Sequence, residues 1–163
     1  MALREVFRSL PVVKEIVRED ALPPGMQDWA RHTMTLGWEA RLKTRARLRS
    51  DEGLEFGIAL RLGVMLRDGD CLAVSSAQTV VRVVEEPESV LVIVPTDAEE
   101  WARIGYQLGN LHQPIMIGPG EIVCLNTLGL AETLAQLGIA FTDAERPFTP
   151  LAPMMDHAHD WPS

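Results

Sequence analysis

The side chain best placed to do chemistry is His112, one of four histidines in the chain. A helix is predicted just before it, because Asp97 can cap a helix and Glu100, three residues later, completes a capping-box pattern. Gly109-Asn110 is predicted to end that helix, since both residues tolerate positive φ, and Pro114 prevents its continuation. His112 is therefore expected at an exposed corner between a helix and a strand.

A neutral imidazole at such a corner can bind a metal ion. One histidine alone makes a poor site, because nickel, copper or zinc takes about four ligands or more. Near the axis of a two-fold dimer, His112 and its symmetry mate would present two imidazoles to one ion. On the residues alone, a surface histidine with no ligand role is the competing interpretation.

A second cluster of possible ligands lies at the end of the chain. His157 and His159 are separated by one residue and flanked by Asp156 and Asp160. Side chains two apart point to opposite sides of an extended chain, so both histidines can bind one ion only if the tail bends, at an entropic cost. Nitrogen and carboxylate donors suit nickel and zinc. The alternative is a flexible tail without ligands.

The remaining reactive groups have plainer interpretations. His32 is expected to be structural or solvent-exposed. The two cysteines, Cys71 and Cys124, lie in apolar runs and form no CxxC pair, which favours buried, reduced thiols. Alternating basic residues are predicted to share one face of a strand, either solvated or docking an acidic partner; they are Lys43, Arg45, Arg47 and Arg49.

Composition and motifs exclude several classes of protein. A net charge of −8 argues against a nucleic-acid binder, which needs basic surface. No apolar run reaches the roughly 18 residues that span a bilayer, and the N-terminus does not read as a signal peptide, so a cytoplasmic protein without membrane partners is expected. The sequence contains no GxSxG, HExxH, Walker A or GxGxxG motif. We therefore expect no catalytic residues and no enzyme.

The first half of the chain is predicted to consist of short strands joined by tight turns. Strands are expected within 12–17, 33–38, 41–49, 54–60, 64–66, 71–74 and 79–84. Such a pattern indicates a small all-β sandwich or half-barrel. The charged segment 85–89 contains a proline and is interpreted as a linker.

The second half changes to an alternation of strands and helices. Strands are predicted at 90–94, 113–117, 121–125 and 139–142, with helices at 97–108 and 128–137. This order is βαββαβ, the ferredoxin-like pattern. The predicted architecture is α+β, with a β-rich domain at 1–86, a ferredoxin-like domain at 89–150 and a flexible, histidine-containing tail at 151–163.

Several motifs together resemble those of the UreE urease accessory proteins. Tyr106-x-Leu108-Gly109-Asn110-x-His112-x-Pro114 is similar to that family's Y-H-L-G-N-R-H-x-P segment. Trp38-Glu39-Ala40-Arg41-x-Lys43-Thr44-Arg45 resembles its W-E-E-R-x-K-S-R stretch. The family's R-D-G-D turn is matched by Arg67-Asp68-Gly69-Asp70, and its P-F-x-P by Pro147-Phe148-x-Pro150.

The resemblance implies a cytoplasmic, homodimeric metallochaperone that carries nickel for assembly of the urease active site. It implies that the N-terminal domain docks partners or peptides and that the ferredoxin-like domain binds metal and dimerises. The family's interfacial metal ligand maps onto His112, and its histidine-bearing tail onto His157 and His159. The implied partners are the GTPase UreG and the urease apoprotein complex. Zinc or copper is expected to bind as well in vitro.

The chain departs from the family pattern at three places. Gln107 replaces a histidine, Leu111 replaces an arginine, and Asn126-Thr127 replaces an Asp-His pair. These losses reduce the expected number of metal ligands to those of one dimer site. They also motivate two alternatives, which are a scaffold of the urease maturation complex with residual metal binding and a general zinc or copper buffer.

Overall fold

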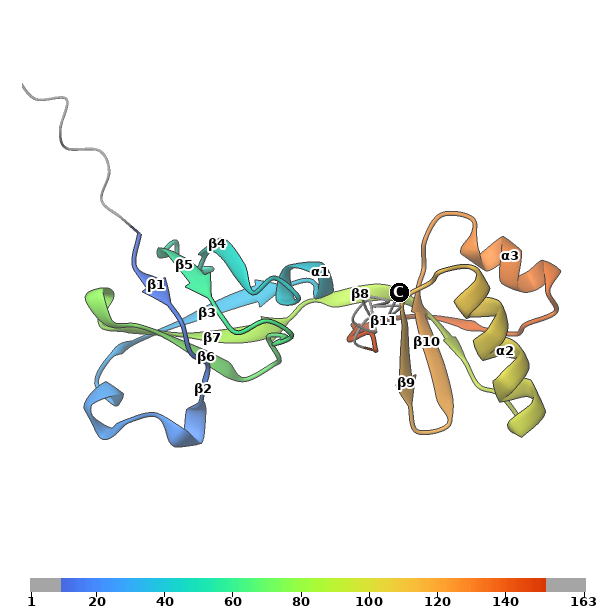
Figure 1. Ribbon diagram of the computed structural model, residues 1–163, viewed down its shortest axis with the longest axis horizontal. Coiled ribbons are helices and arrows are strands. Elements are labelled where there is room, and N and C mark those ends of the chain that lie inside the picture. Colours follow the sequence, from blue (N-terminus) through green and yellow to red (C-terminus); the bar gives the residue numbers. More distant parts are fainter. Residues whose placement is uncertain (1–9, 152–163) are drawn as a thin grey trace, which may run out of the picture. The chain divides into compact units, whose positions relative to one another are not determined.

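The computed structural model describes residues 10–151 of the 163-residue chain. The chain divides into two compact units that meet between Glu86 and Pro87. The first unit is rich in strands, and the second combines strands with two helices (Figure 1). The α+β, two-domain fold predicted from the sequence is therefore confirmed.

The first unit is built from two sheets. A three-stranded sheet has the order β1-β5-β4, and a four-stranded sheet the order β2-β6-β7-β3. The strands are β1 (Val12–Val13), β2 (Val17–Arg18), β3 (Ala30–Leu36), β4 (Arg45–Arg49), β5 (Glu55–Ala59), β6 (Asp70–Val74) and β7 (Thr79–Glu85). One-turn helices η1 (Glu19–Ala21), η2 (Pro24–Met26), η3 (Ser75–Ala77) and α1 (Trp38–Arg41) connect them.

One apolar core lies between these two sheets. Phe56 and Ile58 alternate with more exposed residues along β5, as expected for a strand with one buried face. They belong to the same buried cluster as Met34, Leu72 and Val81 of the other sheet. The sheets thus pack face to face, as the predicted sandwich requires.

Three parts of this unit differ from the sequence prediction. The strand expected within 12–17 is divided into β1 and β2, which belong to different sheets. Residues 38–41 form α1, whereas the prediction placed Trp38 at the end of one strand and Arg41 at the start of the next; the helix turns Arg41 inward. Its side chain is 0% exposed and donates to the Glu85 carboxylate (2.9 Å) and to the Leu66 carbonyl (3.3 Å). Residues 64–66 form no strand either, since the Leu66 N–H donates to the Arg41 carbonyl and its side chain fills the core.

Carboxylates close the free edge of β3. The N–H groups of Thr33 and Thr35 point away from β7 and donate to Glu52 and Asp51, respectively. Both threonine hydroxyls also donate to Asp51, at 2.9 and 3.0 Å. An unpaired strand edge invites association with other strands, and here two acidic side chains occupy it.

The second unit has the expected βαββαβ order. Its elements are β8 (Pro87–Ile93), α2 (Ala98–Asn110), β9 (Ile115–Gly118), β10 (Glu121–Leu125), α3 (Leu130–Gln136) and β11 (Thr142–Pro147). The sheet order is β11-β8-β10-β9, with all neighbours antiparallel. Both helices cover one face of the sheet (Figure 1), where Ile104, Leu108 and Leu134 pack against Leu91 and Ile122.

The last strand was misplaced by the sequence prediction. Ile139 and Phe141 belong to the core beneath the helices and precede the strand. The strand itself is the polar segment Thr142–Pro147, which pairs with β8 at the edge of the sheet. The expected linker at 85–89 also falls mostly within β7 and β8, which leaves only Glu86 between them.

We predict that Asp51→Asn destabilises the first unit at neutral pH. Slight desolvation alone would raise the pKa of Asp51, but hydrogen bonds from Thr35 and Thr33 outweigh it and hold the pKa below its usual value. A lowered folded-state pKa contributes stability above the unfolded pKa, and this stability is lost as pH falls through the folded pKa. Because the carboxylate is exposed and screened, we expect a loss of about 1 kcal/mol at pH 7 in urea unfolding.

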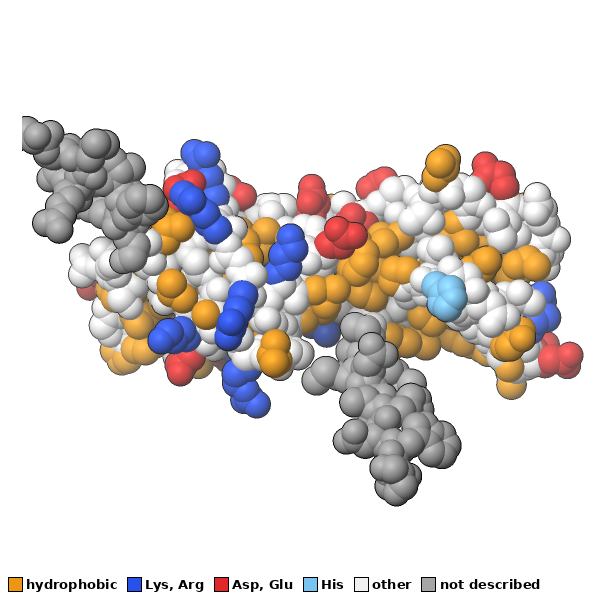
Figure 2. Space-filling model, turned by 45° about the horizontal axis from the view of Figure 1, so that its top comes forward, with side chains coloured by type: hydrophobic (Ala, Val, Ile, Leu, Met, Phe, Trp, Pro, Cys, Tyr) orange, Lys and Arg blue, Asp and Glu red, His pale blue; other side chains and the backbone are white. Residues whose placement is uncertain are grey.

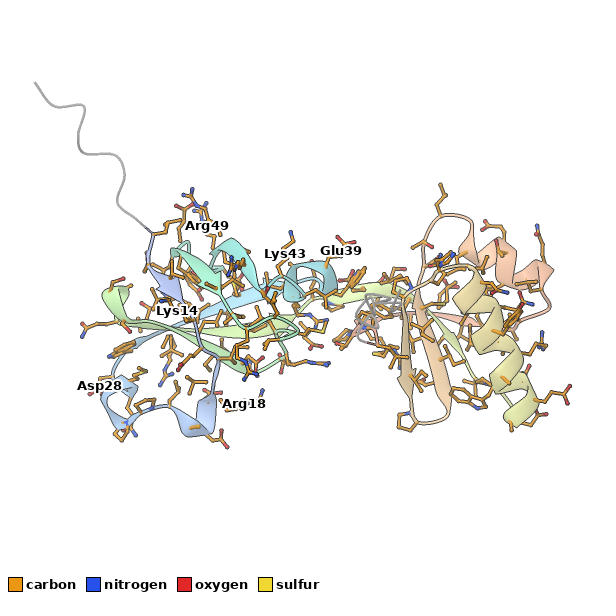
Figure 3. The ribbon with its side chains drawn as sticks, viewed as in Figure 1. Lys14, Arg18, Asp28, Glu39, Lys43 and Arg49 are labelled. Carbon is orange, nitrogen blue, oxygen red and sulfur yellow. The ribbon has the colours of Figure 1, made fainter. Side chains whose placement is uncertain are left out.

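The matched control for this variant is Asp28→Asn, at an exposed carboxylate that makes no hydrogen bond or ion pair among the described residues (Figure 3). It should leave stability unchanged. The difference in free energy of unfolding between the two variants should shrink in acid, where Asp51 is protonated in both the folded and the unfolded state. An equal effect of both substitutions would contradict the edge-closing role of Asp51.

Candidate metal-binding site

His112 lies at the turn that leads from α2 into β9, as the sequence predicted. Leu111 caps the helix, and His112 then adopts φ 53°, in the left-handed region. The His112 N–H donates to the Gly109 carbonyl (3.0 Å), and the Gln113 N–H donates to the Leu108 carbonyl (3.2 Å). These two bonds form a Schellman motif with His112 at the position that glycine usually occupies.

The predicted helix stop at Gly109-Asn110 was therefore wrong. Both residues are helical, and α2 continues through Asn110. The only positive-φ residues other than glycine among the described residues are Gln78 and His112. For a residue with a Cβ, the left-handed region costs roughly 1–2 kcal/mol. The chain keeps a histidine at a position where glycine would be easier to accommodate.

Helix α2 holds this corner firmly in place. The Glu100 N–H donates to the Asp97 carboxylate (2.9 Å), as the capping prediction required. The Glu100 carboxylate accepts instead from the N–H and hydroxyl of Thr96, at 2.7 and 2.9 Å, and these bonds lower its pKa. Ile104 and Leu108 are fully buried on the predicted inner face.

The surface beside the corner is partly apolar. His112 is exposed, and β9 begins three residues later. In β9, Ile115 and Met116 are half-buried and Ile117 is 51% exposed, while Tyr106 on α2 is 67% exposed. Large apolar side chains left in water beside an exposed histidine offer contact area to a second molecule.

The end of the described chain returns to this corner. Phe148 is buried, the Thr149 N–H donates to the Met116 sulfur (3.4 Å), and the Leu151 N–H donates to the Ile115 carbonyl (2.7 Å). Residue 151 thus lies against the first residue of β9, three residues from His112. His157 and His159 lie outside the described residues. The sequence had no local signal for this return, because the bonds join residues more than thirty positions apart.

The other predicted reactive groups belong to the first unit or to the core of the second. His32 belongs to the first unit, where its Nδ1 lies 3.0 Å from the Ser50 hydroxyl, which agrees with the structural role expected of it. Cys71 and Cys124 are buried and free, as predicted. Burial raises the pKa of Cys124 to about 11 and also raises that of Cys71, so both thiols stay protonated and are poor metal ligands.

Within residues 10–151, no three histidine, cysteine or acidic side chains lie close enough together to hold a metal ion. The three departures from the family motif add no ligand. Gln107 and Leu111 are half-buried, with Leu111 packed on the core, and the Asn126 amide donates to Asp143 (3.2 Å). A site at His112 would therefore need donors from a second chain or from residues 152–163.

Comparison with known proteins decides the family. The family model for the N-terminal domain of the UreE urease accessory protein matches residues 13–85, and that for its C-terminal domain matches residues 88–161. The chain belongs to the UreE family. UreE proteins of this family are urease accessory proteins and nickel chaperones, not enzymes, so this chain has a role in urease maturation.

Individual UreE proteins match over most of their length. The urease accessory protein UreE of Pseudomonas putida strain W619 is 38% identical over 120 residues, which cover 74% of each chain. That of Enterobacter sp. strain 638 is 37% identical over 74% of this chain and 79% of its own. That of Alkalilimnicola ehrlichii is 40% identical over 72% of each. No helix in the described part of the chain is long and apolar enough to cross a membrane.

We predict that His112→Gly stabilises the metal-free protein, whereas His112→Ala does not. Glycine removes the energetic cost of the left-handed conformation in the folded state. It also increases the conformational entropy of the unfolded chain, which offsets part of this, so we expect the free energy of unfolding to rise by about 0.5–1 kcal/mol. Alanine keeps a Cβ and should lie within about 0.5 kcal/mol of the parent. Urea unfolding followed by circular dichroism measures both. Equal stability of the glycine and alanine variants would contradict the strain at His112.

Proposed function

We propose that this protein binds nickel at the interface of a homodimer and delivers it for assembly of the urease active site in the cytoplasm. His112 from each protomer supplies the two central imidazoles. His157 and His159 complete the ligand set. The observation that carries the proposal is the position of His112, exposed at a rigid corner of a UreE-family fold with apolar surface beside it.

A second copy of the chain would supply the donors that one copy lacks. A two-fold axis next to His112 places two identical imidazoles on one ion without any further residue. The half-exposed apolar side chains of α2 and β9 give such a dimer a contact surface. Two histidines leave at least two coordination positions of a nickel ion open, and we assign these positions to His157 and His159 of the tail.

The path of the chain brings the tail within reach of His112. Leu151 is bonded to Ile115, and His157 follows six residues later. Six extended residues span up to about 20 Å, whereas the three residues from His112 to Ile115 span at most about 10 Å. Either tail histidine can therefore reach the corner of its own protomer or of its partner. Ligands from a tail can also detach one at a time, which suits a carrier that must release its cargo.

Calorimetric titration of nickel into the metal-free dimer tests the central site. We expect one ion per two chains, and a loss of affinity of more than about a hundredfold in His112→Gly, because even loss of a ligand's outer-shell partner costs about 10–100-fold. His112→Gly is the informative variant, since it keeps or improves the fold. Unchanged stoichiometry and affinity would overturn the assignment of His112. Absence of nickel binding by the parent at micromolar protein would instead favour the scaffold alternative, in which pull-down of UreG does not depend on nickel.

A second titration tests the tail. His157→Ala/His159→Ala should weaken nickel binding by about tenfold or more, equal to about 1.4 kcal/mol, without changing the one-to-two stoichiometry. The matched control is His32→Ala, which removes a histidine of the first unit and should leave nickel binding unchanged. Parallel titrations with zinc and copper separate a nickel carrier from a general buffer. Tighter binding of zinc than of nickel at equal stoichiometry would favour the buffer.

A further inference from the structure

Strand β4 carries a row of basic side chains on the surface of the first unit. Arg45, Arg47 and Arg49 are all exposed, while Ala46 and Leu48 between them face the core. Lys43 precedes the row and is also exposed. Figure 3 shows Lys43 and Arg49 projecting outward from this part of the unit, and Figure 2 shows basic side chains concentrated on it.

The backbone of β4 is unpaired along one side. The strand is the last of its sheet and pairs only with β5. The Leu60 N–H donates to Thr44 and the Ser50 N–H donates to Leu54, so the even-numbered residues make the ladder to β5. In an antiparallel pair, residues that are hydrogen-bonded to the neighbouring strand alternate with residues that are not. The N–H and C=O groups of Arg45, Arg47 and Arg49 therefore point away from β5. No other strand of the described chain occupies this edge.

These cations have few counter-ions, although the chain is strongly acidic. Of these four cations, Arg47 alone forms an ion pair within residues 10–151, with Glu55 at 2.9 Å. Lys43, Arg45 and Arg49 form none among the described residues. Asp51 and Glu52, which follow the strand directly, are bonded to β3. The free edge of β3 is closed by those carboxylates, and the Asp51 N–H donates to the Thr33 carbonyl (2.9 Å). The open part of the β4 edge is therefore Arg45–Arg49.

We propose that the β4 edge binds an extended acidic segment of another protein by strand addition. Residues two apart in a strand lie about 6.6 Å apart, so carboxylates at every second position of an added strand would meet Arg45, Arg47 and Arg49 in register. Main-chain hydrogen bonds to the free edge would supply affinity, and the guanidinium groups would select acidic sequences. This site is separate from the nickel site proposed at His112.

Other occupants fit the edge less well. A second copy of β4 would place arginine opposite arginine, which is destabilising. The chain's own acidic run, Glu85–Glu88, already lies largely within β7 and β8. A nucleic acid has no backbone N–H and C=O groups in strand geometry, so it would leave the free hydrogen-bonding groups of the β4 edge unpaired.

Fluorescence anisotropy of a labelled heptapeptide, TEVEVET, tests the proposal on the full-length protein. We expect micromolar binding that weakens as NaCl rises from about 50 to about 500 mM, and no binding of the basic peptide TKVKVKT. Arg45→Glu/Arg49→Glu should weaken binding more than about tenfold. The matched control, Lys14→Glu/Arg61→Glu, reverses two exposed charges elsewhere in the same unit and should bind as the parent does.

Two further peptides separate strand addition from simple charge attraction. N-methylation of the valines blocks one edge of the added strand, and N-methylation of the glutamates blocks the other. Only the edge that faces β4 matters, so one of the two peptides should lose binding while the other keeps it. Equal binding of both, or equal loss in both, would overturn strand addition, as would equal binding to the Arg45→Glu/Arg49→Glu variant.

Two control measurements complete the test. Tighter binding of a single-stranded oligonucleotide than of TEVEVET, in competition for the same site, would assign the edge to nucleic acid and overturn the proposal. Nickel stoichiometry and affinity should be the same in Arg45→Glu/Arg49→Glu as in the parent. The proposal of a peptide site and the proposal of a nickel site can therefore be refuted independently of each other.

Discussion

The candidate site depends on how helix α2 ends. Four residues separate the end of α2 from the start of β9, and two hydrogen bonds around His112 make the reversal, with φ 53° at the histidine. Glycine would satisfy the same geometry at lower cost. A strained residue at a turn motivates a hypothesis of function, because the strain persists without benefit to the fold. The same bonds that impose the strain also fix the point from which the imidazole extends.

Much of the fold could be predicted from local patterns. Helix α2 has a cap, an apolar face at helical spacing and a proline beyond its end, and the structure agrees within two residues at each boundary. The prediction failed where a distant partner decides the conformation. Residues 38–41 turn into α1 because Arg41 reaches Glu85, 44 residues away. The apolar residues around Ile139 pack under the helices, and a polar segment without apolar alternation makes the strand instead.

The candidate site, too, could be predicted only in part from the sequence. The position of His112 at a helix–strand corner followed from neighbouring residues, whereas the residue that ends the helix did not, since Gly109 and Asn110 are better left-handed residues than histidine. The return of the chain to Ile115 had no local signal at all. Nor did the closure of β3 by Asp51 and Glu52, which leaves β4 as the open edge. Hydrogen bonds between distant residues leave no periodic trace in a sequence.

The two proposed sites use opposite chemistry, and this keeps them from competing. A neutral imidazole binds a divalent cation, whereas a row of guanidinium groups repels one and attracts carboxylates. An acidic chain favours encounter with a cation through its overall charge, because long-range attraction depends on net charge. A partner strand is recognised over shorter distances, since salt screens exposed charges beyond about 8 Å. Local arginines can therefore select an acidic segment on a protein whose net charge is −8.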